Sequence, residues 1–251
     1  MSRSEAPLGQ CDRCDSLSVE DPHWLDDAYS GSHLTRLDTG VVQRNLDTWA
    51  TVGLVMRLLG LKEHLDWGAG DGLLVRFIRD GGWESRGHEP WGKMTYAPDW
   101  RDDGRSPDLI TAFEVFEQFL HPEKETQKIF SRGAPLIIIG TETWEGQGRD
   151  WGYLAPTEGQ HIFFWSRKAL TLLGERWGYR LSPLGRYWAF WKPDKIGHGA
   201  LSVIGTLLSG WLWHPIKSQI LTGPAPGVSR DWLWVQEERK GEGRPPTERP
   251  F

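Results

Sequence analysis

The chain has 251 residues, which is long enough for one α/β domain with a buried core and an appendage. Its formal net charge of -5 leaves no surplus of Lys and Arg to neutralise phosphates, so we expect no nucleic-acid partner. With 2 cysteines and no apolar N-terminal signal, the composition predicts a cytoplasmic protein without a disulfide framework.

The N-terminal region, residues 1–40, begins with a polar stretch of ten residues that we expect to be loose. Cys11 and Cys14 then form a C-x-x-C pair, which is half of the ligand set of a zinc ribbon. A tetrahedral zinc site would have to recruit His23 or His33, or share the metal across a dimer. The alternative is a metal-free turn.

An apolar periodic run from Leu46 to Leu61 predicts a helix that stops at Gly60. The central stretch follows and reads Leu65-Asp66-Trp67-Gly68-Ala69-Gly70-Asp71-Gly72, an apolar strand that passes through a glycine loop into a helix over 73–80. Glycines permit positive φ and close approach of a ligand to the main chain, and the helix N-terminus offers amides to a polar or anionic group. We expect bare amides there.

The spacing of the glycines decides between nucleotide classes. Leu73 stands where a dinucleotide-binding loop requires its third glycine, so the NAD fingerprint fails. Residues 83–90 predict a second strand, and Glu89 at its end is suited to hold a vicinal diol. Loop and acid together therefore predict a site for a ribose-containing ligand.

The D-x-G-x-G-x-G pattern resembles motif I of class I S-adenosylmethionine (SAM) dependent methyltransferases. The resemblance implies a Rossmann-like three-layer α/β sandwich whose sheet is mostly parallel, with a final antiparallel strand. It also implies that SAM is the cofactor and that it is held by the loop and by the end of the second strand: Asp66, Gly68, Ala69, Gly70, Gly72, Glu89 and Pro90. In some bacterial members a Y…DxG…RN stretch accompanies an N-terminal C-x-x-C, so Tyr29 and Arg44 are candidates for contact with SAM or substrate; a surface Tyr and a solvated Arg are the alternatives.

The segment after Pro107 extends the resemblance. Residues 108–112 read as the fourth strand, and the family pattern D-L-I-T-x-x-E-V-x-E-H is matched at Glu114 and Glu117, with Gln118 in place of the family's His. Phe113 and Glu114 join the cofactor set by this resemblance. The usual helix and third strand are missing before this point; Asp99 is the nearest acid for the adenine amine, and Trp91 or Trp100 is a candidate to stack on the adenine.

Five further elements complete a SAM-binding domain over residues 41–193. The sequence predicts a helix at 122–132, a buried strand at 135–140, a helix at 167–177 capped by Ser166, and a hairpin of strands at 179–184 and 186–191. Residues 199–214 are uncharged and apolar at helical spacing, but too few for a membrane span. In this helical appendage, 194–235, the apolar face is expected to pack on the domain or on a second subunit in a homodimer, or to contact a membrane surface peripherally. Residues 236–251 are expected to form a disordered tail.

The function predicted is methyl transfer from SAM to a small-molecule acceptor, and analogy with relatives suggests a sugar or glycan precursor. A hydroxyl acceptor requires a base, and His161 is the first hypothesis because it follows the fifth strand at the carboxyl edge of the sheet. Glu117, Glu142 and Tyr153 are its rivals, and a histidine that only fixes the loop backbone is the alternative. A non-catalytic SAM-binding or scaffold protein is the second hypothesis.

Overall fold

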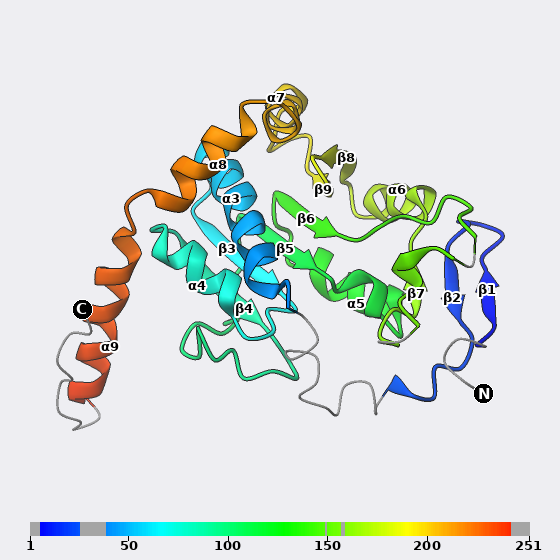
Figure 1. The fold of residues 1–251 in the computed structure, drawn as a ribbon, viewed down its shortest axis with the longest axis horizontal. Helices are drawn as coiled ribbons and strands as arrows, with labels where there is room; N and C mark the ends of the chain where they lie inside the picture. Colours follow the sequence, from blue (N-terminus) through cyan, green and yellow to red (C-terminus); the bar gives the residue numbers. More distant parts are fainter. Residues whose placement is uncertain (1–5, 26–38, 149, 157–158, 242–251) are drawn as a thin grey trace.

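The computed structural model describes residues 6–25, 39–148, 150–156 and 159–241. A six-stranded sheet in the order β4-β3-β5-β6-β9-β8 forms its centre (Figure 1). The first four strands in this order are parallel, and β9 runs antiparallel to both of its neighbours. The predicted α/β class and the antiparallel end of the sheet are confirmed. The strands are β3 (Glu63–Trp67), β4 (Glu84–His88), β5 (Leu109–Phe113), β6 (Leu136–Gly140), β8 (Arg180–Leu184) and β9 (Tyr187–Trp191).

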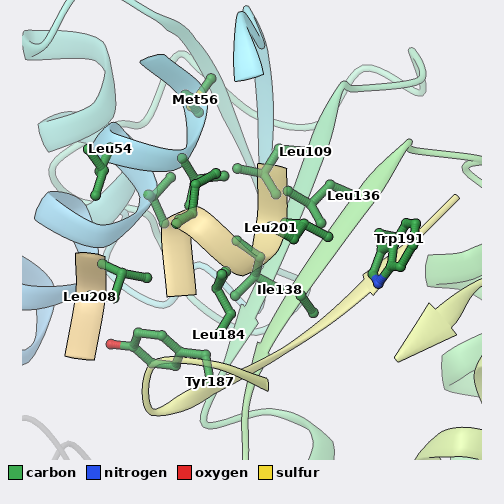
Figure 2. Close-up of a cluster of buried hydrophobic side chains, with 14 of the residues drawn as sticks. Leu54, Met56, Leu109, Leu136, Ile138, Leu184, Tyr187, Trp191, Leu201 and Leu208 are labelled. Atoms are coloured by element: carbon green, nitrogen blue, oxygen red, sulfur yellow. The ribbon is translucent and has the colours of Figure 1, made fainter. Parts of the chain in front are cut away.

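Helices cover both faces of this sheet because its strands are apolar on both sides. In β6, Leu136 and Ile138 point into the core beneath α3, α4 and α7, whereas Ile137 and Ile139 point into the core beneath α5 and α6. Figure 2 shows the first of these cores, where Leu54, Leu201 and Leu208 meet the strand residues. The helices are α3 (Val41–Leu59), α4 (Leu73–Asp80), α5 (Pro122–Phe130), α6 (Arg167–Arg176) and α7 (His198–Ser209).

The ends of the helices follow local signals. Helix α3 begins at Val41, earlier than predicted, and stops at Gly60, which has the left-handed φ of 68°. Helix α4 has the predicted bounds. At the start of α6, the Oγ of Ser166 accepts a hydrogen bond from the amide of Ala169 at 2.9 Å, as a capping serine does.

A small second sheet joins the N-terminal region to a strand much later in the chain. Strands β1 (Leu8–Gln10) and β2 (Leu17–Val19) form a hairpin, and β2 pairs antiparallel with β7 (Phe163–Phe164). Residues 8–10 are therefore a strand and not the loose segment expected from composition. The hairpin lies beside the loop that leads into α6 (Figure 1), where the amide of Ser166 donates to Ser16 at 3.2 Å.

The C-terminal region is more structured than predicted. The helix expected over 199–214 ends at Ser209, because Gly210 is extended, and two more helices follow: α8 (Trp213–Thr222) and α9 (Pro226–Gly241). The start of the expected tail thus lies inside α9. Buried Asp231 fixes α9 to α4 by accepting hydrogen bonds of 2.7 and 2.8 Å from Arg79. None of the described helices is both long and apolar enough to cross a membrane.

One apolar side of α7 is buried within the domain. Leu201, Ile204 and Leu208 are buried against the sheet and α3, so this helix packs on the domain. Trp211, within the apolar run 199–214, is 84% exposed because it follows the break at Gly210.

Candidate functional site

The glycine loop between β3 and α4 requires glycine for two different reasons. Gly68 and Gly70 have φ values of 76° and 52°, in the left-handed region that favours glycine. A Cβ at Gly68 would lie 2.4 Å from Cγ2 of Val115, so packing excludes a side chain there. A Cβ at Gly70 would meet no atom within 4 Å. Gly70 therefore faces open space, which a ligand can fill.

The carboxylate of Glu89 lies directly against this loop. Its Oε2 accepts a hydrogen bond from the amide of Gly70 at 2.8 Å, and its Oε1 accepts from the amides of Trp91 and Gly92, also at 2.8 Å. A carboxylate has about four acceptor positions, so three bonds leave capacity at Oε2. The fixed orientation of this oxygen suits a hydroxyl donor beside the loop.

The expectation of bare amides is wrong for part of the loop. The amides of Gly68 and Ala69 donate to the carbonyl of His88 at 2.8 and 3.2 Å, and Gly72 donates to Ala69 at 2.8 Å. These amides donate to backbone carbonyls of the protein itself because the loop folds back on the end of β4. Helix α4 does begin without a side-chain cap. What the loop offers to a ligand is therefore mainly the carboxylate of Glu89 and the open space at Gly70.

Asp66 lies behind the loop in a buried polar chain. The hydroxyl of Thr111 donates to Oδ1 of Asp66 at 2.6 Å, so Nε2 of His64 must donate to that hydroxyl and Nδ1 must accept from Ser85. Burial raises the pKa of Asp66 to about 7 and lowers that of His64 to about 3. This chain ties β3 to β4 and β5, and it supports the loop from below.

A second cluster lies where β5 and β6 end. Glu114 follows β5 with a φ of 56°, and Glu117 is in the short 3₁₀ turn η2 (Phe116–Gln118). His161 approaches from the loop before β7, with its Nε2 3.9 Å from Oε1 of Glu117. The side chain of Glu117 is 0% exposed. Burial, together with the charge of Glu114, raises the pKa of Glu117 to about 8.

The tautomer of His161 follows from its neighbours. Its Nδ1 lies 2.6 Å from the carbonyl of Tyr153, in the turn η3 (Gly152–Leu154), and a carbonyl accepts only from an N–H. Nδ1 therefore carries a proton, and in the neutral imidazole Nε2 presents a lone pair towards Glu117. The hydroxyl of Tyr153 lies 3.1 Å from that of Thr141, and burial raises the pKa of Tyr153 well above its usual range.

Three further hydrogen bonds hold the two carboxylates beside the imidazole. The amide of Ile162 donates to the carbonyl of Glu117 at 2.9 Å, and the indole of Trp165 donates to the carbonyl of Phe116 at 2.9 Å. Gln118 donates to the carbonyl of Glu114 at 2.6 Å. The glutamine that replaces the expected histidine thus stabilises the turn that carries the cluster.

A family model described as "Methyltransferase domain" matches residues 43–184, more than half of the chain. The chain belongs to this methyltransferase family. The matched residues run from α3 to the end of β8 and include both the glycine loop and the cluster around Glu117. A search of the curated proteins gives no match.

Three solved methyltransferase structures to which this chain is similar are the following. The magnesium protoporphyrin IX methyltransferase ChlM of Synechocystis PCC 6803 with bound S-adenosylhomocysteine (SAH) is 13% identical, with 67% of this chain and 90% of that chain covered and a TM-score of 0.45. The mitomycin 7-O-methyltransferase MmcR is 14% identical, with coverages of 66% and 59% and a TM-score of 0.49. The methyltransferase domain of the bacterial protein CtHen1-C is 17% identical, with coverages of 59% and 98% and a TM-score of 0.43.

The methyltransferase uses SAM, and its loop fits this cofactor: Gly70 leaves open space beside Glu89, and Oε2 of Glu89 has remaining acceptor capacity. Pro90 is exposed next to Glu89, and Phe113 precedes Glu114 at the end of β5. Arg44 lies near the start of α3. Tyr29 lies outside the described residues.

The residues predicted to contact the adenine lie in different surroundings. Asp99 is exposed on the turn before Trp100. Trp100 packs under the guanidinium groups of Arg76 and Arg79 and against Trp234, so its ring faces α4 and α9. Trp91 is 88% exposed and follows Glu89 closely, which leaves it as the aromatic candidate beside the cradle.

Zinc at the C-x-x-C pair receives no support. Both cysteines are free thiols in the β1–β2 turn, and within the described part of the chain no group of three metal-ligating residues includes them. His23, one of the proposed partners, is not grouped with them, and His33 lies outside the described residues. The carbonyl of Cys14 instead accepts a hydrogen bond from Ser166.

The sequence missed how the N-terminal hairpin supports the site. The amide of Val19 donates to the carbonyl of Ile162 at 2.8 Å, and the indole of Trp24 donates to the carbonyl of Gly159 at 2.8 Å. These bonds fix the segment on either side of His161. The apolar run Ile162–Trp165 was the only local signal that this loop is anchored in a core.

Proposed function

We propose that this methyltransferase transfers the methyl group of SAM to a hydroxyl group of a small molecule bound beside His161. The observation that carries the proposal is the pairing of two features at the carboxyl edge of one sheet. β3 and β4 end in the glycine loop and Glu89, whereas β5 ends beside the cluster of Glu117 and His161. Open α/β sheets bind their ligands along this edge.

SAM, when bound, supplies a methyl carbon already activated by its sulfonium, and SAH remains after transfer. The protein has to position the acceptor oxygen and to take up its proton. We infer that Nε2 of His161 accepts this proton, since its lone pair is available in the neutral imidazole and its Nδ1 is fixed by Tyr153. Glu117, whose Oε1 lies 3.9 Å from this nitrogen, would in its ionised form stabilise the imidazolium that forms.

A cavity of about 470 Å³ adjoins this edge between α3, α8 and the β8–β9 turn. Asp47, Arg186 and Lys217 are among its lining residues, so it offers hydrogen-bonding and charged groups. Tyr187 also lines it, and its ring lies 4.9 Å from that of Phe113, one residue before Glu114. A cavity of this size, with apolar walls and charged groups in its lining, has room for a hydroxylated acceptor such as a sugar or glycan precursor.

The first test is calorimetric titration of the full chain with SAM and SAH. We expect both to bind, and Glu89→Ala to weaken binding, whereas Glu123→Ala on the exposed side of α5 should not. Absence of binding by both ligands would refute the proposal.

The second test measures SAH release in the presence of monosaccharides, nucleotide sugars and phenols. We expect release with a hydroxylated acceptor, and a strong loss of turnover in His161→Ala at unchanged SAH affinity. SAH binding without turnover on any acceptor would instead favour the scaffold function. Turnover unchanged in His161→Ala would remove this residue as the base.

A further inference from the structure

The cavity between α3, α8 and the β8–β9 turn is lined mostly by residues that follow the family match, which ends at residue 184. Arg186 and Tyr187 come from the turn and the start of β9, whereas Trp213 and Lys217 come from α8. The volume of about 470 Å³ lies in the range of ligand pockets. The C-terminal helices, which the family model does not include, therefore help to form a site large enough for a ligand.

Arg186 brings to this cavity a positive charge that no carboxylate of the described residues pairs with. The side chain is exposed on the β8–β9 turn, and its guanidinium carbon lies 5.6 Å from the centroid of the Tyr187 ring. A guanidinium has five N–H donors in one plane, and stacking on a ring leaves the donors at its edge available. Arg186 can therefore bind an oxyanion that enters the cavity.

Lys217 supplies a second cation from α8. Its Nζ donates to Oδ1 of Asp47 on α3, and the side chain is 23% exposed. The same oxygen of Asp47 accepts a hydrogen bond of 2.9 Å from Gln43, which fixes the carboxylate. An ammonium group has three N–H donors, so the ion pair leaves two of them. Asp47 therefore holds Lys217 in place while two donors remain for a ligand.

The charges of the lining favour a phosphate group. Asp47 offsets only one of the two cations Arg186 and Lys217, so the lining carries one net positive charge in a chain whose net charge is -5. A phosphate monoester carries a charge of about -1.5 to -2 and three acceptor oxygens, which suits two cations better than a single carboxylate does. Trp213 is half-buried in the same lining and offers a flat face on which a sugar or a base can pack.

Tyr187 connects this cavity to the carboxyl edge of the sheet. Its ring lines the cavity and lies 4.9 Å from the ring of Phe113 at the end of β5. Its hydroxyl lies 3.2 Å from that of Thr48, which fixes the ring against α3. A compound held in the cavity therefore reaches the strand ends at which the proposed methyl transfer takes place.

We propose that this cavity binds the phosphate group of a phosphorylated acceptor, with Arg186 and Lys217 as the anion-binding residues and Trp213 against the ring that carries the phosphate. The acceptor is thus a sugar phosphate or a nucleotide sugar, since both carry a phosphate group close to hydroxyl groups. The inference rests on the proposed function for the use of this compound as the methyl acceptor.

Calorimetric titration of the full chain with glucose, glucose 6-phosphate and UDP-glucose, with and without SAH, tests this site. We expect a phosphorylated compound to bind and glucose to bind at least about tenfold more weakly, because glucose lacks the anion. Tighter binding of UDP-glucose would assign the site to nucleotide sugars, and tighter binding of glucose 6-phosphate to sugar phosphates. Equal affinity for all three compounds, or binding of neither phosphorylated compound, would overturn the proposal.

Variants of the lining locate the binding. Arg186→Gln should weaken the binding of the phosphorylated compounds at least about tenfold, since it removes a charged donor. Arg180→Gln is the matched control, because Arg180 is exposed on the same hairpin with its guanidinium carbon 5.6 Å from the ring of Trp191, but does not line the cavity. Asp47→Asn should strengthen binding, since it removes the carboxylate that competes for Lys217. Thermal unfolding verifies that each variant is folded. Equal affinities of the Arg186 and Arg180 variants, or weaker binding by Asp47→Asn, would overturn the site.

SAH titration of the same samples separates this inference from the proposed function. Protein that binds SAH but neither phosphorylated compound would overturn the phosphate site and leave the proposed function standing. Protein that binds a phosphorylated compound through Arg186 but does not bind SAH would count against the proposed function and not against the phosphate site.

Discussion

Substitution of alanine for Gly70 tests the cofactor cradle against an internal control. Gly60 and Gly70 both have left-handed φ values, 68° and 52°, and a Cβ at either position meets no atom within 4 Å. A left-handed alanine costs about 1–2 kcal/mol. Because 1 kcal/mol lowers Tm by about 2–4 °C in a protein of this size, Gly60→Ala and Gly70→Ala should both lose about 2–8 °C.

The two variants should differ in cofactor binding. Gly60 ends α3, whereas Gly70 faces the open space next to Glu89, so only there does the added methyl group enter the space proposed for the cofactor. Overpacking of this kind costs about 1–3 kcal/mol, which corresponds to about a 5- to 150-fold loss of SAH affinity. Gly60→Ala should bind SAH as the wild type does.

Thermal unfolding and calorimetric titration with SAH measure both effects on the same samples. Gly68→Ala extends the series, since its Cβ would lie 2.4 Å from Val115, and we expect it to be the least stable of the three. Equal SAH affinity of the Gly60 and Gly70 variants would refute the reasoning, because the cofactor would then not occupy the space above Gly70.

Three other substitutions test the surrounding structure. The pKa of Asp66 is about 7 in the folded protein and 3.8 in the unfolded chain. Between these pH values the unfolded chain binds fewer protons than the folded protein. The free energy of unfolding therefore falls as pH rises from about 4 to 7, by at most about 4 kcal/mol. Asp66→Asn should flatten this dependence in denaturant titrations, and a parallel pH profile would contradict the assignment. Asp231→Ala leaves the buried Arg79 with Glu84 as its remaining carboxylate partner and should cost about 1.5–3 kcal/mol, against little change for the exposed Asp194→Ala; a loss below about 1 kcal/mol would show that α9 is not anchored there. Trp24→Phe removes the hydrogen bond to Gly159 and should lower turnover at unchanged SAH affinity, and full turnover would show that the hairpin does not position His161.

Elements with strong local signals were predicted closely. Helix α4 has its expected bounds because Gly72 and Gly81 enclose a short amphipathic run, and α6 starts after Ser166 because the hydroxyl caps it. The unbroken apolar run of β6 predicted a strand buried on both faces. The position of Glu89 beside the loop followed from the same logic, since the ends of adjacent parallel strands meet at one edge.

Elements stabilised by distant residues were missed. Strands β1, β2 and β7 are only two or three residues long, and Leu17 finds its partner in Phe164, far along the chain. Helix α9 has a weakly patterned sequence and depends on Asp231 meeting Arg79, 152 residues away. Composition alone therefore placed the start of a tail inside a helix.

The sequence by itself determined the fold class, the glycine loop and the acid that closes the second strand, because dihedral preferences, caps and periodicity act over a few residues. Only the tertiary structure decided what surrounds Glu117: full burial, a carboxylate without a good hydrogen-bond partner, and the lone pair of His161 directed at it. Burial and the choice of tautomer depend on which segments pack together, here η2, η3 and the loop before β7, and no local pattern carries that information.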